Sequence, residues 1–138
     1  MSEPTSAHDV LVLPRTTAIE LMHAAQLSPD RSIAGVLGLR DGLAEGLTPG
    51  QADSAESLAH ACDQAEQAGG VFALYYSQPA AAAEPHDLPQ ALREAATNRP
   101  LLIVSLNTKG VLETRAWRWC EGQYIEQTLT AIEPPTAA

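Results

Sequence analysis

Two nearly continuous apolar runs constrain the fold of this chain most. Val71–Tyr76 reads VFALYY and Leu101–Leu106 reads LLIVSL. Neither run alternates between polar and apolar residues, as a strand with one wet face does, and both have the length of a strand. We therefore expect two strands that are buried on both faces, within a sheet that is covered on both sides.

Five further segments have the character of strands. Val10–Leu13 is a short apolar run that ends at a proline, and Ser32–Arg40 is nearly all apolar. The dipeptide Asp41-Gly42 is a strong hairpin signal, and Glu121-Gly122 predicts a second tight turn. The predicted strands are therefore Val10–Leu13, Ser32–Arg40, Leu43–Leu47, Val111–Trp119 and Gln123–Leu129.

Three helices are predicted from apolar residues that recur on one helical face. Thr16 or Thr17 can supply the N-cap of the first helix, and Asp87 can supply that of the third. Pro89 is tolerated in the third helix because it lies in the first turn. The predicted spans are about 16–26, 52–67 and 87–96.

These elements place the chain in the α+β class, with features of an α/β sandwich. We expect a mixed, mostly antiparallel sheet of about six or seven strands, flanked by about three helices. The 138 residues are enough for one compact core, and neither a repeat nor an internal boundary is visible. The expected organisation is a disordered N-terminal tail (1–9), a single domain (10–131) and a C-terminal tail (132–138).

Acidic residues outnumber basic ones, with 17 Asp and Glu against eight Lys and Arg and a net charge of −9. This balance argues against nucleic acids and anionic membranes as partners, because both require a basic surface. It is compatible with a basic protein partner. The first residues lack a signal-peptide pattern, and no apolar run approaches the roughly 20 residues that span a bilayer, so we expect a cytoplasmic location.

Cysteine and histidine give no metal-binding pattern. Cys62 and Cys120 are far apart in the sequence, no CxxC or Cys/His zinc spacing occurs, and we expect both thiols to be reduced and buried. The four histidines are scattered over separate elements. We expect His23 to be packed on its helix or to lie on the surface, and His60 to be solvated.

Three segments, in this order and at these spacings, resemble the JAB/MPN (Mov34/MPN/PAD-1) domain family, the fold of the JAMM metalloisopeptidases. LPRTTAIELMHAAQLSPDRSIAGVLGLRDG at 13–42 resembles the opening helix and strand of the family. The helix at 52–67 that leads into VFALYYSQP resembles the helix before the family's Gly-Ile-Tyr-His-Ser-His-Pro. LLIVSLNTKGVLETRAWRWCEGQYIEQ at 101–127 resembles its closing strands. The resemblance implies a compact prokaryotic JAB/MPN domain, related in architecture to cytidine deaminases.

The resemblance also implies where a zinc site would lie. Active members of the family hold zinc with two histidines of His-x-His and an aspartate, and a glutamate acts as the general base. Carried over by position, the histidines fall on Tyr76 and Gln78, the glutamate on Ser32, and the serine and aspartate of Ser-x-x-Asp on His86 and Pro89. A phenol ionises only near a pKa of ~10, an amide is a poor ligand and a proline side chain offers no donor. The implied motif is therefore degenerate, with no metal ligand, no catalytic residue and no zinc.

The leading hypothesis is a catalytically inactive domain that serves as a protein-binding or dimerisation scaffold. The resemblance implies a ubiquitin-like or sulfur-carrier protein, or an active JAMM relative, as the partner, and a homodimer is a further option. One alternative is a zinc metalloisopeptidase whose site is rebuilt from Tyr76, His86 and Asp87. Another is a small-molecule or peptide sensor that uses the vacated groove. The candidate groove residues are Tyr75, Tyr76, Ser77, Gln78, His86 and Asp87.

Two plainer interpretations stay open. Tyr76 fills the volume of the old metal cavity, and Gln78 satisfies backbone groups beside it. Trp117 and Trp119 lie on one face of their predicted strand, and they are either packed in the core or displayed at an interface, where tryptophan is enriched.

Overall fold

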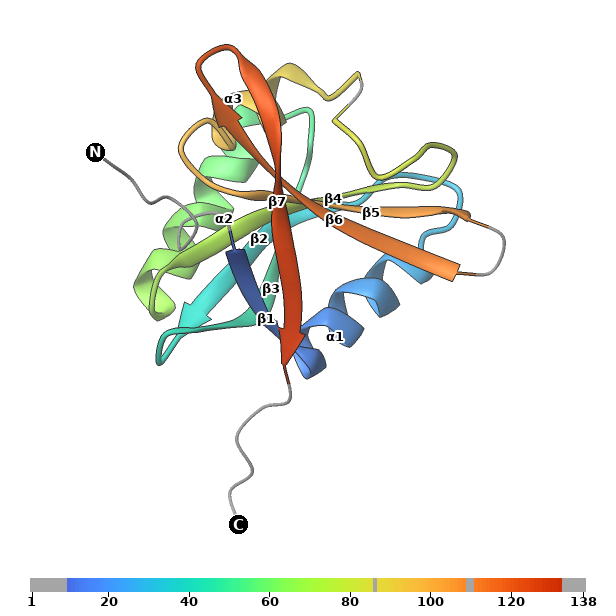
Figure 1. Ribbon diagram of the computed structural model, residues 1–138. Helices are drawn as coiled ribbons and strands as arrows, with labels where there is room; N and C mark the ends of the chain where they lie inside the picture. The colour runs from blue at the N-terminus through green and yellow to red at the C-terminus, as the bar shows by residue number, and fades with distance from the viewer. Residues whose placement is uncertain (1–9, 86, 109–110, 133–138) are drawn as a thin grey trace, which may run out of the picture.

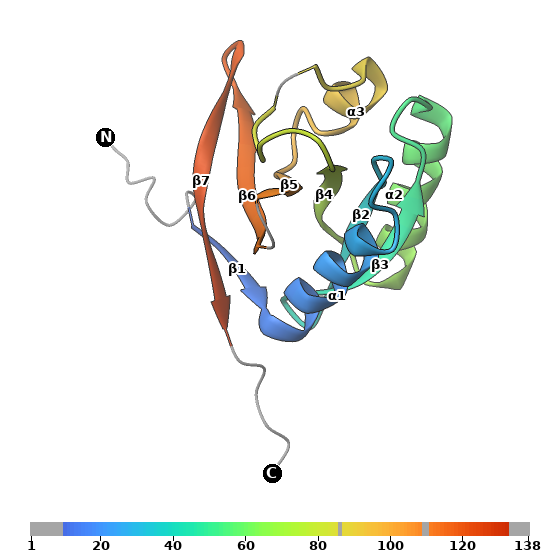
Figure 2. The same ribbon diagram turned by 90° about the vertical axis from the view of Figure 1, so that its right-hand side faces the viewer.

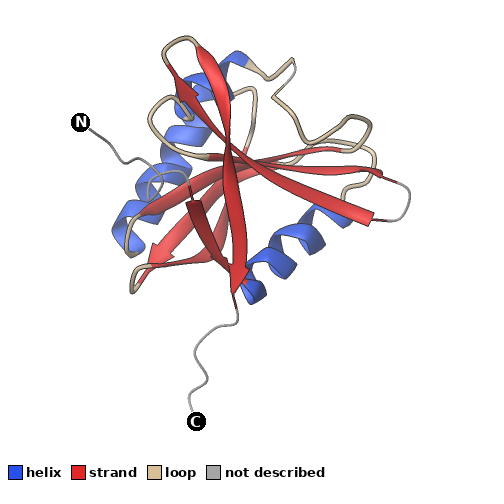
Figure 3. Cartoon of the chain, in the orientation of Figure 1, coloured by secondary structure: helices blue, strands red, loops and turns tan. Residues whose placement is uncertain are grey.

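A computed structural model describes residues 10–85, 87–108 and 111–132 of the chain (Figure 1). Within this described part, three helices flank one sheet of seven strands. The strands are β1 (Val10–Pro14), β2 (Ala34–Arg40), β3 (Leu43–Gly50), β4 (Val71–Gln78), β5 (Leu101–Thr108), β6 (Val111–Cys120) and β7 (Gln123–Ile132). The helices are α1 (Arg15–Gln26), α2 (Ala55–Ala68) and α3 (Gln90–Ala95). Figure 3 shows the same arrangement coloured by type of element.

The sheet is mixed and mostly antiparallel, as predicted. Its strand order is β1-β7-β6-β5-β4-β2-β3. Among the described strands, β1 with β7 and β4 with β5 are parallel neighbours, and the other neighbouring pairs are antiparallel. The sheet curls strongly, so that its two edge strands, β1 and β3, come close to each other (Figure 2). The α+β class is therefore confirmed.

Helices cover both faces of the curled sheet. Figure 2 shows α1 between the two ends of the curl and α2 on the opposite side of β2 and β3. The strand β4 sends Leu74 and Tyr76 toward α2 and α3, and Ala73 and Tyr75 toward the face that α1 covers. The predicted burial of this apolar run on both faces is thus confirmed, and β5 repeats the pattern.

The sequence misplaced the N-caps of two helices. The N-cap of α1 is Pro14, and no side chain caps it. Thr17 instead donates its hydroxyl to the carbonyl oxygen of Ala44 at 2.7 Å, a buried bond that fixes α1 to β3. Asp87 does not cap α3, because the helix begins later, after Pro89, and Asp87 has a φ of 53° in the turn before it.

Several predicted boundaries shift by a few residues. β2 begins at Ala34 and not at Ser32. α2 begins at Ala55, and the side chain of its N-cap, Ser54, accepts a hydrogen bond from the backbone nitrogen of Ser57. β3 continues to Gly50 through Pro49, which an edge strand tolerates because one side of its backbone has no partner strand. β7 includes residue 132, one residue beyond the predicted domain end.

Both hairpin turns form as predicted, with positive φ at Asp41-Gly42 and at Glu121-Gly122. Both cysteines are free, but only Cys62 is buried, because Cys120 lies half-exposed at the end of β6. The predicted tails, residues 1–9 and 133–138, lie outside the described residues. None of the described helices has the length and apolar character that crossing a membrane requires.

Candidate functional site

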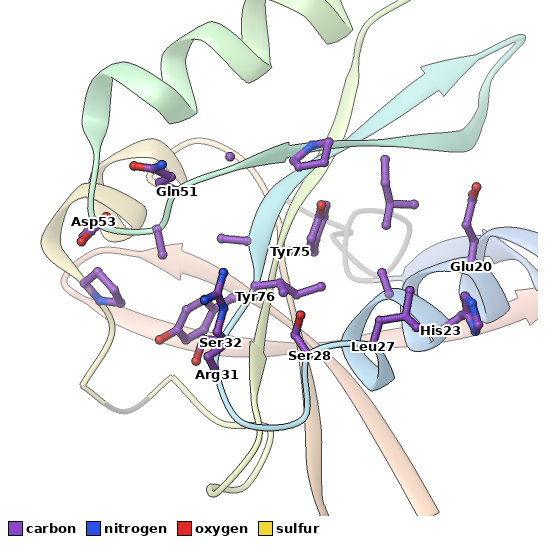
Figure 4. A pocket seen from close by; sticks show the side chains of 18 residues that line it. Glu20, His23, Leu27, Ser28, Arg31, Ser32, Gln51, Asp53, Tyr75 and Tyr76 are labelled. Carbon is purple, nitrogen blue, oxygen red and sulfur yellow. The ribbon is translucent and has the colours of Figure 1, made fainter.

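A pocket of about 870 Å³ opens between the end of α1, the segment that follows it, the end of β3 and β4 (Figure 4). The residues that follow α1 lead into β2, and the residues that precede α2 follow β3, so the pairing of Ala34 with Gly50 brings the two segments to one end of the sheet. The side chains labelled in Figure 4 come from α1, from the segment that follows it, from the residues between β3 and α2, and from β4. The lining includes Glu20, His23, Leu27, Ser28, Arg31, Ser32, Gln51, Asp53, Tyr75, Tyr76 and Pro89.

Three positions of the implied zinc motif meet at this pocket. Ser32 precedes β2, Tyr76 lies near the end of β4 and Pro89 precedes α3, yet all three line the same cavity. Ala34 pairs with Tyr76 in the sheet, which explains how residues from distant parts of the chain become neighbours. The structure therefore brings together Ser32, Tyr76 and Pro89, and it adds Tyr75, the neighbouring groove candidate.

Tyr75 is almost fully buried at the pocket, with 2% of its surface exposed. Its ring packs directly over Gly35, where an added Cβ would lie 2.5 Å from the tyrosine oxygen. Burial raises the pKa of Tyr75 to about 12, so the hydroxyl stays neutral at any physiological pH. Among the described residues, none forms a hydrogen bond with this hydroxyl.

Ser77 and Gln78 do not belong to the pocket lining, and their side chains bond to backbone groups. The Ser77 hydroxyl accepts from the backbone nitrogen of Ile33 at 2.8 Å, and the Ser77 nitrogen donates to the carbonyl of Ile33 at 2.9 Å. Gln78 is 6% exposed and donates through Nε2 to the carbonyl of Glu84 at 3.1 Å. Its Oε1 is buried and has no partner among the described residues. These bonds match the interpretation that Gln78 satisfies backbone groups.

Residues on β5 and β6 hold the loop that follows β4, a role that the sequence did not reveal. Ser105 donates to the carbonyl of Ala81 at 2.6 Å, and Trp117 donates through Nε1 to the carbonyl of Ala83 at 2.9 Å. Arg115 bonds the Glu84 carboxylate at 3.2 Å. These three contacts fix residues 81–84 against the sheet.

The two tryptophans have different surroundings. Trp117 packs against the core that α2 and α3 cover, and the guanidinium of Arg115 lies 5.1 Å from its ring centroid. Trp119 makes an edge-to-face contact with Tyr124, with ring centroids 4.9 Å apart. Both rings are half-exposed, so packing accounts for part of each side chain, and the interface interpretation stays a prediction.

The described residues contain no group of three or more His, Cys, Asp or Glu side chains that would suit a metal ion. Asp87 is exposed and is absent from the pocket lining, and His86 lies outside the described residues. His23 and Glu20 on α1 do line the pocket, which the sequence did not predict. They became pocket residues through the packing of α1 inside the curl, and their spacing alone gives no such signal.

Comparison with known proteins supports the fold. The sequence matches no family model and no curated protein. The structure is similar to a solution structure of a protein from Desulfitobacterium hafniense, with 20% sequence identity, a TM-score of 0.62, and coverage of 91% of this chain and 94% of that chain. A solution structure of a protein from Salinibacter ruber is also similar, with 20% identity, a TM-score of 0.57, and coverage of 92% and 94%. At this level of identity, the likeness concerns the fold alone.

Proposed function

We propose that this chain is a metal-free JAB/MPN-like domain that acts as a protein-binding scaffold. One observation carries the proposal: Ser32, Tyr76 and Pro89, the positions of the implied zinc motif, line one open pocket and offer no carboxylate, imidazole or thiolate to a metal. An alcohol, a phenol and a proline ring do not make a zinc site at neutral pH. An open pocket whose motif positions lack metal ligands suits binding better than metal chemistry.

The shape of the pocket suits an extended protein segment. It is open to solvent along the ends of α1, β3 and β4, and β3 is an edge strand of the sheet. We propose a ubiquitin-like or sulfur-carrier protein, whose tail would enter the pocket, or an active JAMM relative as the partner. A second copy of the chain is the other scaffold partner that we consider. The net charge of −9 favours a partner with a basic surface, and we expect the complex to be cytoplasmic.

The first test is the metal content of the purified protein, measured by elemental analysis before and after zinc loading and dialysis. We expect no stoichiometric zinc. One tightly held zinc per chain would contradict the metal-free proposal, and Asp87 and His86 would then be the first ligands to mutate.

The second test titrates a sulfur-carrier protein into the isotope-labelled chain and follows binding by NMR. We expect chemical-shift changes at Ser32 and Tyr76, and we expect Tyr76→Ala to weaken binding. The matched controls are the same carrier without its C-terminal tail and the variant Tyr124→Ala, which changes a tyrosine far from this pocket. Equal binding of the tailless carrier would exclude the pocket as the docking site for the tail.

A second function is favoured by the hydroxyl of Tyr75. It lines the pocket and forms no hydrogen bond with a described residue, so it is a donor for a small polar molecule bound there. We therefore retain a small-molecule sensor as the second candidate.

A further inference from the structure

The pocket contains polar groups for which the described residues supply no partner. The hydroxyl of Tyr75 lines the pocket and forms no hydrogen bond with a described residue. The side chain of Arg31 is exposed and forms no ion pair or hydrogen bond with a described residue, although its backbone nitrogen donates to the carbonyl of Ser28. The Tyr75 hydroxyl is therefore available to donate a hydrogen bond to a molecule in the pocket. Tyr75 lies on β4, and Arg31 lies on the segment between α1 and β2, so the two groups reach the pocket from different elements.

The positions of the charged side chains around the pocket determine where a charged group of a ligand can bind. Among the described residues that line it, Arg31 is the only Lys or Arg, and Glu20 and Asp53 are the only carboxylates. In the view of Figure 4, Glu20 and Asp53 lie at opposite ends of the pocket, and Arg31 lies between them, on the side of Tyr76. An anionic group is therefore best accommodated in the middle of the pocket, and poorly at either end.

The dimensions and surfaces suit a small planar molecule. A volume of about 870 Å³ falls in the range of about 300–1,000 Å³ that is usual for small-molecule sites. Tyr76 is half-buried in the lining and offers an aromatic ring as a surface for stacking. Ser28 and Ser32 add hydroxyl groups on the same segment as Arg31.

We propose that the pocket binds a small aromatic carboxylate that carries a second polar group. The carboxylate pairs with Arg31, the aromatic ring packs against Tyr76, and the second polar group accepts the hydrogen bond that the Tyr75 hydroxyl donates. The inference deepens the second candidate function above and rests on the pocket being a binding site. It does not require the JAB/MPN resemblance or a protein partner.

The probe is 4-hydroxybenzoate, titrated into the labelled protein and followed by NMR. We expect saturable shifts at residues 28–35 and 75–76, and weaker binding of 4-hydroxybenzamide, which has the same shape without the charge. We also expect no binding of the cation 4-hydroxybenzylamine at these residues. Equal affinity for the three compounds, or shifts confined to other parts of the chain, would overturn the proposal.

Two variants separate the contributions of the two anchors. Arg31→Ala is expected to remove the preference for the carboxylate over the amide. Tyr75→Phe is expected to lower the affinity for 4-hydroxybenzoate about threefold to tenfold, because one neutral hydrogen bond is lost. The affinity for benzoate should not change, because benzoate lacks the second polar group. An equal loss for both ligands would show that Tyr75 acts only through packing and would overturn its assigned role.

Matched control variants exclude general effects on charge and folding. Arg40→Ala removes an exposed arginine at the far end of β2, outside the pocket lining. Tyr124→Phe removes a tyrosine hydroxyl that is buried and has no partner among the described residues, and that lies outside this pocket lining. Neither control should change binding of 4-hydroxybenzoate, and a change as large as that of Arg31→Ala or Tyr75→Phe would overturn the proposal.

The experiments distinguish failure of this inference from failure of the scaffold proposal. Binding of 4-hydroxybenzoate that depends on Arg31 and Tyr75, together with failure of every protein partner to bind, would support this inference and remove the scaffold. Binding of a carrier tail that depends on Tyr76, with no binding of the aromatic acids, would support the scaffold and remove this inference.

Discussion

Gly35 and Tyr75 occupy neighbouring strands and depend on each other for space. The phenol of Tyr75 lies where a side chain at Gly35 would be, and the carbonyl oxygen of Thr48 borders the same point. The glycine is needed here for close approach of a ring, since its φ is not in the left-handed region. The position of Tyr75 at the pocket therefore depends on the absence of a side chain one strand away.

We predict that Gly35→Ala destabilises the protein by about 1–3 kcal/mol, the usual cost of overpacking, because neither backbone nor ring can yield easily. Urea denaturation measures the change. Gly50→Ala is the matched control, since its new methyl would meet the flexible tip of Leu58 at 3.2 Å and should cost less. Equal stability of the two variants would contradict the packing argument.

Single residues of the site were only partly predictable from the sequence. Tyr76, Ser32 and Pro89 were found because a resemblance to a family assigned motif positions to them, and Tyr75 was found as the neighbouring groove candidate. Arg31, the α1 residues and residues 51–53 of the lining were missed, because nothing in their spacing shows that the fold brings them together. Residues that meet only through tertiary structure leave little local signal.

At the scale of elements, strong local patterns predicted strands and turns correctly, but the ends of helices were predicted less well. The apolar run of β4 and the turn at Asp41-Gly42 were placed correctly, since burial on both faces and positive φ each leave a clear local pattern. The predicted caps at Thr17 and Asp87 were wrong, because a hydrogen bond to β3 and a tight turn used these residues instead. The strand order was not predicted. The parallel pair of β1 and β7 joins segments from the two ends of the chain, and local sequence patterns do not indicate such distant partners.

An ion pair joins the two strands of the β6–β7 hairpin. Arg115 bonds both carboxylate oxygens of Glu126, at 2.8 and 2.6 Å, and it also reaches Glu84 in the loop after β4. The hydrogen bond from Arg115 holds the pKa of Glu126 below its usual range. The carboxylate is therefore more easily ionised in the folded chain than in the unfolded one, and folding is favoured where it is charged.

We predict that this contribution is present above a pH of about 4.3 and is lost as the pH falls through the lowered pKa of the folded state. Glu126→Gln should thus lower stability at pH 7, by no more than about 1 kcal/mol because the pair is partly exposed, and should match the wild type more closely at pH 3. Urea midpoints at both pH values measure this. Glu45→Gln is the control, since Glu45 is exposed on β3 and has no ion-pair partner among the described residues. A difference between wild type and Glu126→Gln that widens toward acid would contradict the assignment.

At the scale of the whole molecule, one curled sheet separates two apolar clusters. The cluster on the face that α1 covers includes Leu21, and the cluster beneath α2 and α3 includes Leu58. Strands β4 and β5 contribute alternate residues to both, so neither cluster can be lost without disturbing strands that the other needs. The pocket is lined by Tyr75, which belongs to the first cluster, and by Tyr76, which packs against the second, so its shape depends on both clusters.

This arrangement predicts that the chain unfolds as one cooperative unit. Leu21→Ala and Leu58→Ala should each lower stability by about 2–5 kcal/mol, although they lie on opposite faces, whereas Ile19→Ala should have little effect because Ile19 is 53% exposed on α1. Urea denaturation followed by circular dichroism and by tryptophan fluorescence should give coincident transitions for the wild type and for both variants. Transitions that separate in Leu21→Ala alone would mean that α1 and its face unfold independently. The pocket would then open and close with α1 while the rest of the sheet stayed folded, and ligand binding would stabilise one face instead of the whole molecule.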